Sequence, residues 1–236
     1  MKIGNIISSI LLLNNLNTHL NLPLSSILVS SQLSYDTYSV KYDDINSGIA
    51  TKILGIDEMR SKASDYVNDN VLEIAIGTGL QSEFYDWNRI KSFSGIDNSV
   101  GMLDQANNKI NTINKNKNIP IELKSMDAKK LSYESNKFDT VIDTFSMCVF
   151  SEPSEILKEM VRVVKDDGKI ILLENSVSRN PTIKIIQDIF EPIVTPFSKG
   201  CKWNVNVPEL AKNQGLKEVD YIAIQSGTIM LGIYNK

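Results

Sequence analysis

The sequence contains a single histidine, His19, and only two cysteines, Cys148 and Cys201. Because the one histidine precedes the folded domain, we expect no imidazole for proton transfer there. Two cysteines do not make a disulfide framework; they suit a reducing compartment or a pair of buried thiols, and the count does not separate the two. The formal net charge of −3 gives no basic surface for a phosphate backbone, so we expect no nucleic-acid partner.

The first 34 residues contain no Asp, Glu or Arg. Their longest apolar run, 6–13, is broken by serines and falls far short of the ~20 residues that span a bilayer. An acid-free, Ser-rich start favours an organelle leader, mitochondrial first, although such leaders usually carry Arg. A secretory signal and a disordered or surface-lying arm of a cytoplasmic protein remain open. We therefore expect a leader or arm over 1–34 and one globular domain over 35–236.

The most informative stretch is 71–79, where an apolar strand that carries one acid, Glu73, runs into Gly77 and Gly79. Strand, glycine turn and helix, here 80–87, present a nucleotide at the carboxyl edge of a doubly wound sheet. The glycines permit positive φ and a close approach of a ligand to the backbone. A second strand, 93–97, ends in Asp97, an acid placed where it can bind the two hydroxyls of a ribose.

Strand and helix patterns alternate along the rest of the chain, whose 42% apolar content is ordinary for a soluble fold. Helical residues extend over 35–67 with a break near 46–48, and Ile53, Met59 and Ala63 are expected on one buried face. Further elements are predicted as helices over 100–114, 152–164 and 181–194, strands over 121–126, 138–145 and 169–175, and a hairpin of 218–225 with 228–234. The pattern predicts an α/β fold: a doubly wound, mainly parallel seven-stranded sheet with one antiparallel edge strand.

In this order and spacing, five segments resemble the motifs of class I S-adenosylmethionine (SAM) dependent methyltransferases. They are 73–79, 95–103, 127–131, 138–143 and 157–174. Within that superfamily, 144–153 and 200–204 are similar to the branch of ubiquinone/menaquinone-biosynthesis and membrane-associated alkyl-thiol methyltransferases. The chain departs from the pattern at three places. Ala75 replaces a usual glycine, residues 166–167 replace Pro-Gly, and Asn175 replaces a histidine of several members.

The resemblance implies SAM as the cofactor, a Rossmann-like fold and no metal. Residues expected around SAM are Glu73, Ala75, Gly77, Thr78, Gly79, Asp97, Asn98, Met102, Asp127, Ala128, Asp143 and Thr144. Residues that can line an acceptor pocket, although each is equally expected in the core, are Phe145, Met147, Cys148, Phe190 and Trp203. Glu174 and Asp143, which end strands at the active edge of the sheet, are the candidates for a catalytic base.

The resemblance also implies a reaction: in-line transfer of the sulfonium methyl to a small acceptor. The helix over 181–194 has more apolar positions than one core-facing stripe needs, which indicates a lipophilic acceptor of quinone-type, lipid-like or thiol chemistry. A dimer interface or a peripheral membrane contact explains the same surplus equally well, and the oligomeric state stays open. A SAM-binding assembly or scaffold factor without turnover is the alternative function. A nicotinamide dehydrogenase fits poorly, because Ser82 stands where its turn has a third glycine.

Overall fold

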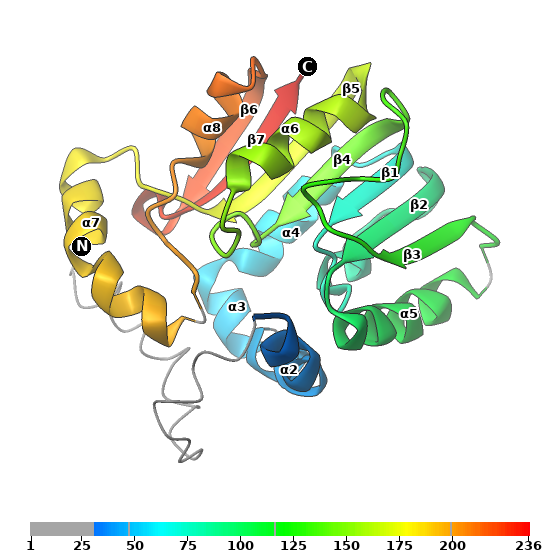
Figure 1. The fold of residues 1–236 in the computed structure, drawn as a ribbon, viewed down its shortest axis with the longest axis horizontal. Helices are drawn as coiled ribbons and strands as arrows, with labels where there is room; N and C mark the ends of the chain where they lie inside the picture. Colours follow the sequence, from blue (N-terminus) through cyan, green and yellow to red (C-terminus); the bar gives the residue numbers. More distant parts are fainter. Residues whose placement is uncertain (1–30, 47, 116, 199) are drawn as a thin grey trace.

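The computed structural model describes residues 31–46, 48–115, 117–198 and 200–236 (Figure 1). Seven strands form one sheet in the order β3-β2-β1-β4-β5-β7-β6. They are β1 (Asp69–Ile74), β2 (Ile90–Asp97), β3 (Ile121–Ser125), β4 (Phe138–Thr144), β5 (Val164–Asn175), β6 (Lys217–Ile224) and β7 (Ile229–Asn235). The strands from β3 to β5 pair in parallel, and β7 is antiparallel to both of its neighbours. The predicted seven-stranded, mainly parallel sheet is confirmed. Its antiparallel strand, β7, is the second strand from the edge, because β7 pairs with β5 and the other strand of the hairpin, β6, forms the edge.

Helices cover both faces of this sheet (Figure 1). They are α2 (Ser31–Asn46), α3 (Ile49–Leu54), α4 (Ile56–Ser64), α5 (Val100–Asn114), α6 (Pro153–Val163), α7 (Pro181–Phe197) and α8 (Val207–Asn213). Helices α4 and α5 pack on one face, and α6 and α8 pack on the other. Ile171 and Leu173 of β5 face the α4 side, whereas Ile170 and Leu172 face the α6 side. Burial on both faces explains why this strand is apolar without alternation.

The prediction of a helix over 80–87 is wrong. After Gly79 the chain makes a single 3-10 turn, η3 (Leu80–Glu83). Leu80, Tyr85 and Trp87 are all buried, but a helix would point Tyr85 away from the other two. Packing of Tyr85 and Trp87 against the apolar side chains of β1 and β2 therefore prevails over the local helical pattern.

The helical segment before β1 is interrupted twice rather than once. Besides the break near Gly48, Gly55 adopts the left-handed conformation, with φ of 76°, between α3 and α4. This second break changes the helical phase, so that Ile53 is 76% exposed while Met59 and Ala63 are buried. The prediction of one buried face that includes Ile53 is therefore wrong.

Helix α7 lies to one side of the sheet (Figure 1). Its buried Gln187 accepts the amide of Ser178 and donates to the carbonyl oxygens of Ser176 and Trp203. Its solvent face carries large apolar side chains at Ile185, Ile189, Phe190 and Ile193. The helix thus has more apolar positions than its core contact uses, as predicted. No helix among the described residues combines the length and apolarity needed to cross a membrane.

Candidate cofactor and active site

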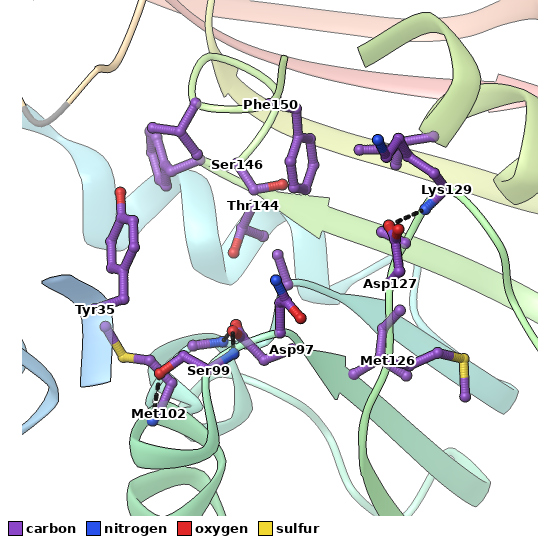
Figure 2. A pocket seen from close by; sticks show the side chains of 18 of the residues that line it. Tyr35, Asp97, Ser99, Met102, Met126, Asp127, Lys129, Thr144, Ser146 and Phe150 are labelled. Atoms are coloured by element: carbon purple, nitrogen blue, oxygen red, sulfur yellow. Dashed lines mark hydrogen bonds between the residues drawn. The ribbon is translucent and has the colours of Figure 1, made fainter. Parts of the chain in front are cut away.

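The strand order reverses between β1 and β4, and a cavity of about 420 Å³ opens at the carboxyl ends of these strands. Figure 2 shows its wall, to which α2, β2, β4 and the segments that follow the strands contribute. Of the residues expected around SAM, the wall contains Ala75, Gly77, Asp97, Asn98, Met102, Asp127, Ala128 and Thr144. The remaining four, Glu73, Thr78, Gly79 and Asp143, are buried and are not in this wall as the described residues form it.

The turn after β1 leaves room for a ligand. Gly77 and Gly79 have φ of 57° and 77°, and the nearest atom to a Cβ added at Gly77 would be 3.9 Å away. Ala75, which replaces a glycine of the motif, also has positive φ, at 47°. This conformation costs a residue with a side chain about 1–2 kcal/mol. The departure at Ala75 is therefore accommodated by backbone strain at the edge of the cavity, where such strain is common.

Asp97 ends β2 and faces the cavity (Figure 2). Its Oδ2 accepts the amide of Gly77 at 2.9 Å, and its Oδ1 accepts the amide of Ser99 at 2.8 Å. Burial raises the pKa of this carboxyl, and the amides oppose that rise. The amide of Asn98 also binds this carboxylate, and of its roughly four acceptor positions some capacity remains for the hydroxyls of a ribose. The site thus fits the ribose of SAM.

The neighbouring part of the wall, after β3, is more open. Asp127 is exposed, and its Oδ1 accepts the amide of Lys129 at 2.9 Å. Met126 and Ala128 lie on either side of Asp127 in the chain and also line the cavity. An acceptor group between two apolar side chains suits an adenine ring with an exocyclic amine, which is the role expected for Asp127.

Helix α2 forms a wall of the cavity that the sequence analysis did not assign to the site. Tyr35 and Tyr42 line the cavity from this helix. Asp36 accepts from the Ser99 hydroxyl and, at 3.0 Å, from the Gly101 amide, so its carboxylate lies at the N-terminus of α5, where the helix dipole favours it. Since α2 begins at Ser31, the predicted boundary at residue 34 falls within its first turn. The signal in the sequence that could have assigned this helix to the site was Asp36, the first acid after the acid-free segment.

Glu73 lies behind the glycine turn rather than in the wall. It is buried in β1, and Tyr85 donates to its Oε2 at 2.8 Å. Desolvation raises the pKa of Glu73 to about 8, although Tyr85 and the buried Arg60 oppose the shift. Its Oε1 has no hydrogen-bond partner among the described residues. This unsatisfied oxygen fits a cationic donor such as the ammonium of SAM.

The two residues predicted as a catalytic base meet at the ends of β4 and β5. Asp143 and Glu174 are each fully buried and interact through their side chains. Burial raises the pKa of both carboxyls, most strongly that of Glu174. Neither is part of the cavity wall, whereas Ser146, which hydrogen-bonds to both, lines it. Sequence analysis gave Ser146 no role at the site, although it lies within the segment 144–153 and two residues after the strand that carries Asp143.

Only one residue of the predicted acceptor set lines this cavity. That residue is Phe145, at φ of 58° and with the Arg60 guanidinium 5.2 Å from its ring. The other four lie elsewhere: Met147 and Cys148 are buried in the loop after β4, Trp203 is half-buried, and Phe190 is on the exposed face of α7. Further apolar side chains in the wall are Val149, Phe150 and Ile156. Their positions in the loop after β4 and at the start of α6 make this part of the cavity apolar.

The cysteines form a disulfide, Cys148–Cys201, with 4.7 Å between their Cα atoms. The expectation of thiols is therefore wrong, because a count of cysteines does not show that the β4 loop meets the segment after α7. The amide of Lys202 donates to the Cys148 carbonyl oxygen at 2.8 Å, and the Asn175 side-chain amide donates to both sulfurs. The bridge thus fixes the loop that lines the cavity to the chain between α7 and α8.

We expect Cys201→Ser to lower the free energy of unfolding by about 2–4 kcal/mol, because the bridge joins residues 53 positions apart. Urea unfolding followed by circular dichroism measures the change. Dithiothreitol should bring the wild type to the stability of the variant and leave the variant unchanged. A wild type that does not respond to the reductant would show that the two sulfurs are not bonded in solution.

The sequence matches the family described as methyltransferase domain over residues 72–172. It is 25% identical over 192 residues to the mitochondrial methyltransferase OMS1 of Saccharomyces cerevisiae, covering 75% of this chain and 40% of that protein. It is 33% identical over 120 residues to a phosphatidylethanolamine N-methyltransferase of Cereibacter sphaeroides, covering 49% and 57%. It is 31% identical over 161 residues to a demethylmenaquinone methyltransferase of Lactobacillus johnsonii, covering 60% and 65%. The chain therefore spans between 40% and 65% of the length of these relatives.

Solved structures share the fold. A SAM-dependent methyltransferase from Aquifex aeolicus superposes with a TM-score of 0.59 at 16% identity, covering 84% of this chain and 97% of that one. Residues 72–172 therefore form a methyltransferase domain, and the resemblance to SAM-dependent methyltransferases, with SAM as the cofactor, is confirmed.

Proposed function

We propose that this chain transfers the sulfonium methyl of SAM to a small lipophilic acceptor of quinone-type or lipid-like chemistry. The observation that carries the proposal is the division of the cavity wall. Asp97 and Asp127 provide acceptors for a nucleoside on one side, and Phe145, Val149 and Phe150 provide an apolar surface on the other. Two relatives are named for phosphatidylethanolamine and demethylmenaquinone, which are acceptors of this kind.

SAM supplies a methyl group already activated on sulfur, so the protein mainly binds, aligns and excludes water. Asp97 would hold the ribose, and the turn at Gly77 gives the amino-acid end of SAM room beside the backbone. Tyr35 and Tyr42 of α2 would shield the bound cofactor from solvent. The apolar wall at Phe145 would then orient a flat or aliphatic acceptor beside the methyl group.

The test is methyl transfer from labelled SAM to three acceptors: a short-chain demethylmenaquinol, phosphatidylethanolamine vesicles and an alkyl thiol. Label in the quinol or the lipid supports the proposal, and label in the thiol alone replaces the acceptor class. Calorimetry with S-adenosylhomocysteine is the control for an intact cofactor site. Binding without transfer to any acceptor would favour the second candidate, a SAM-binding assembly or scaffold factor.

Two truncations test whether the first residues belong to the catalytic domain. Removing residues 1–30 should leave the thermal midpoint and the affinity for S-adenosylhomocysteine unchanged, because α2 begins at Ser31. Removing residues 1–46 takes away Tyr35, Asp36 and Tyr42. The affinity for S-adenosylhomocysteine should then fall by about tenfold or more, because a few polar and packing contacts are lost. Equal affinity of the two truncations would contradict the role of α2. Weaker binding by the shorter truncation would show that the leader also packs on the domain.

We also propose that the protein resides in an organelle, with mitochondria favoured, and contacts a membrane peripherally. Support comes from the acid-free first 34 residues, from the mitochondrial relative OMS1 and from the apolar solvent face of α7. Residues 1–30 lie outside the described part of the chain. Fractionation of cells that express the full chain with a C-terminal tag tests this; the same distribution without residues 1–30 would contradict a targeting role for the leader.

A further inference from the structure

Two carboxyl groups lie together behind the cavity wall. Asp143 and Glu174 are fully buried, and Ser146 donates to both of them, through its hydroxyl to Asp143 and through its amide to Glu174 at 3.3 Å. The ion pairs among the described residues include neither of them. Two carboxylates so close in a site of low dielectric constant do not both ionise, so the pair retains one proton and carries one negative charge.

One hydroxyl group joins this pair to the cavity. Ser146 donates through Oγ to Asp143, and its side chain lies in the cavity wall between Thr144 and Phe150 (Figure 2). The amides of Ser146 and Met147 donate to Glu174 at 3.3 and 3.2 Å, which fixes the loop to the pair. The positive φ of Phe145, 58°, turns the chain so that Ser146 comes back over Asp143. Among the described residues, this hydroxyl is therefore the side-chain group that connects the carboxyls to the cavity.

We propose that Ser146 is a catalytic residue that deprotonates a hydroxyl-bearing aromatic acceptor, a phenol or quinol, with Asp143 and Glu174 as the proton store. This inference rests on the proposed function and narrows its acceptor. The acceptor O–H bond breaks and its proton binds Ser146 Oγ while the proton of Ser146 moves to Asp143. The acceptor oxygen, or the ring carbon conjugated with it, bonds to the methyl carbon as the C–S bond of SAM breaks and leaves its electron pair on sulfur. Methylation at carbon gives a keto tautomer, which re-aromatises by moving that carbon's proton to oxygen.

The chemistry of the pair suits this class of acceptor. A phenol has a pKa of about 10, as tyrosine does, and needs a base near neutral pH, whereas a thiol near 8.5 ionises readily without one. When the pair accepts a second proton it becomes neutral, and burial favours the neutral form of a carboxyl group. The carboxyl of Glu73 on β1 interacts electrostatically with Asp143, and the Arg60 guanidinium on α4 acts on Glu73 and lies beside Phe145. Because the pKa of Glu73 is raised to about 8, this carboxyl is neutral near pH 7 in the cofactor-free protein and adds no charge beside the pair.

The retained proton is tested without any acceptor. Infrared difference spectra of the full-length protein with S-adenosylhomocysteine, wild type minus Glu174→Gln, should show the carbonyl band of a protonated carboxyl at pH 7. Asp143→Asn should remove or shift the same band. Absence of that band from the difference spectrum overturns the inference, whether or not the protein methylates any acceptor.

The role of Ser146 is tested by rates with labelled SAM. Ser146→Ala should lower kcat for a 1,4-naphthalenediol by about 100-fold or more, as loss of a general base does, and leave the alkyl-thiol rate and the S-adenosylhomocysteine affinity within about threefold. The remaining diol rate should rise about tenfold per pH unit, following the free phenolate. Ser94→Ala, which removes a buried hydroxyl of β2 outside the cavity wall, should keep the wild-type rate and pH profile.

Equal losses for diol and thiol in Ser146→Ala would assign the serine to loop structure and overturn the inference. An unchanged diol rate and pH profile would overturn it as well. No transfer to the diol also overturns it, but transfer to vesicle lipid in the same assay would leave the proposed function standing. No transfer to any acceptor would remove both.

Discussion

Asp97→Ala is expected to abolish measurable binding of S-adenosylhomocysteine. The variant loses the acceptor for two ribose hydroxyls, and hydrogen bonds to a charged group contribute about 1.5–3 kcal/mol each, which corresponds to a fall in affinity of about 100-fold or more. It also leaves the amides of Gly77 and Ser99 without their acceptor, so the glycine turn loses its tie to the end of β2. Titration calorimetry measures the affinity.

Two further variants separate ribose binding from general disruption of the site. Asp97→Asn keeps the size of the side chain and one acceptor oxygen, so its affinity should lie between wild type and Asp97→Ala. Asp127→Ala removes an exposed carboxylate that accepts a single described hydrogen bond, from Lys129, and should cost no more than about tenfold. Near-native affinity of Asp97→Ala, with an unchanged circular dichroism spectrum, would contradict the assignment of this cavity to SAM.

Glu73→Gln is expected to remove a loss of stability that the wild type shows as pH rises from 4.5 to 8. In the folded protein without cofactor, desolvation raises the pKa of Glu73 from 4.5 to about 8. Over this range the folded state holds a proton that the unfolded chain has released. The contribution of that proton to the free energy of unfolding is therefore complete below pH 4.5 and is lost as pH rises through 8. By linkage the effect is on the order of a few kcal/mol.

Urea unfolding of the cofactor-free protein at pH 5, 6, 7 and 8 measures this difference. The other carboxyls with raised pKa values, Asp97, Asp143 and Glu174, act in the same direction in both proteins and cancel when the variant is compared with wild type. Glu155→Gln, which changes an exposed carboxylate of α6, should follow the wild-type curve. Parallel curves for wild type and Glu73→Gln would mean that Glu73 is ionised in the folded protein.

Local signals in the sequence determined the sheet and the cofactor side of the cavity. The period of apolar residues and the N-cap Ser99 are properties of neighbouring residues, and they placed β1, β4 and α5 within a few positions. Parallel strands in this order bring their carboxyl ends to one edge, so Gly77, Asp97 and Asp127 meet there without further information. Their spacing along the chain was therefore sufficient to predict that they line one cavity.

Contacts between distant segments were decided by the tertiary structure alone. The pairing of Cys148 with Cys201, the wall that Tyr35 and Tyr42 of α2 build and the position of Ser146 over Asp143 each depend on how separate elements pack. A break at one residue, Gly55, was enough to turn Ile53 out of the core, because helical phase is lost at a left-handed residue. Periodicity shows which face of an element is apolar. What that face meets depends on the packing of the whole chain.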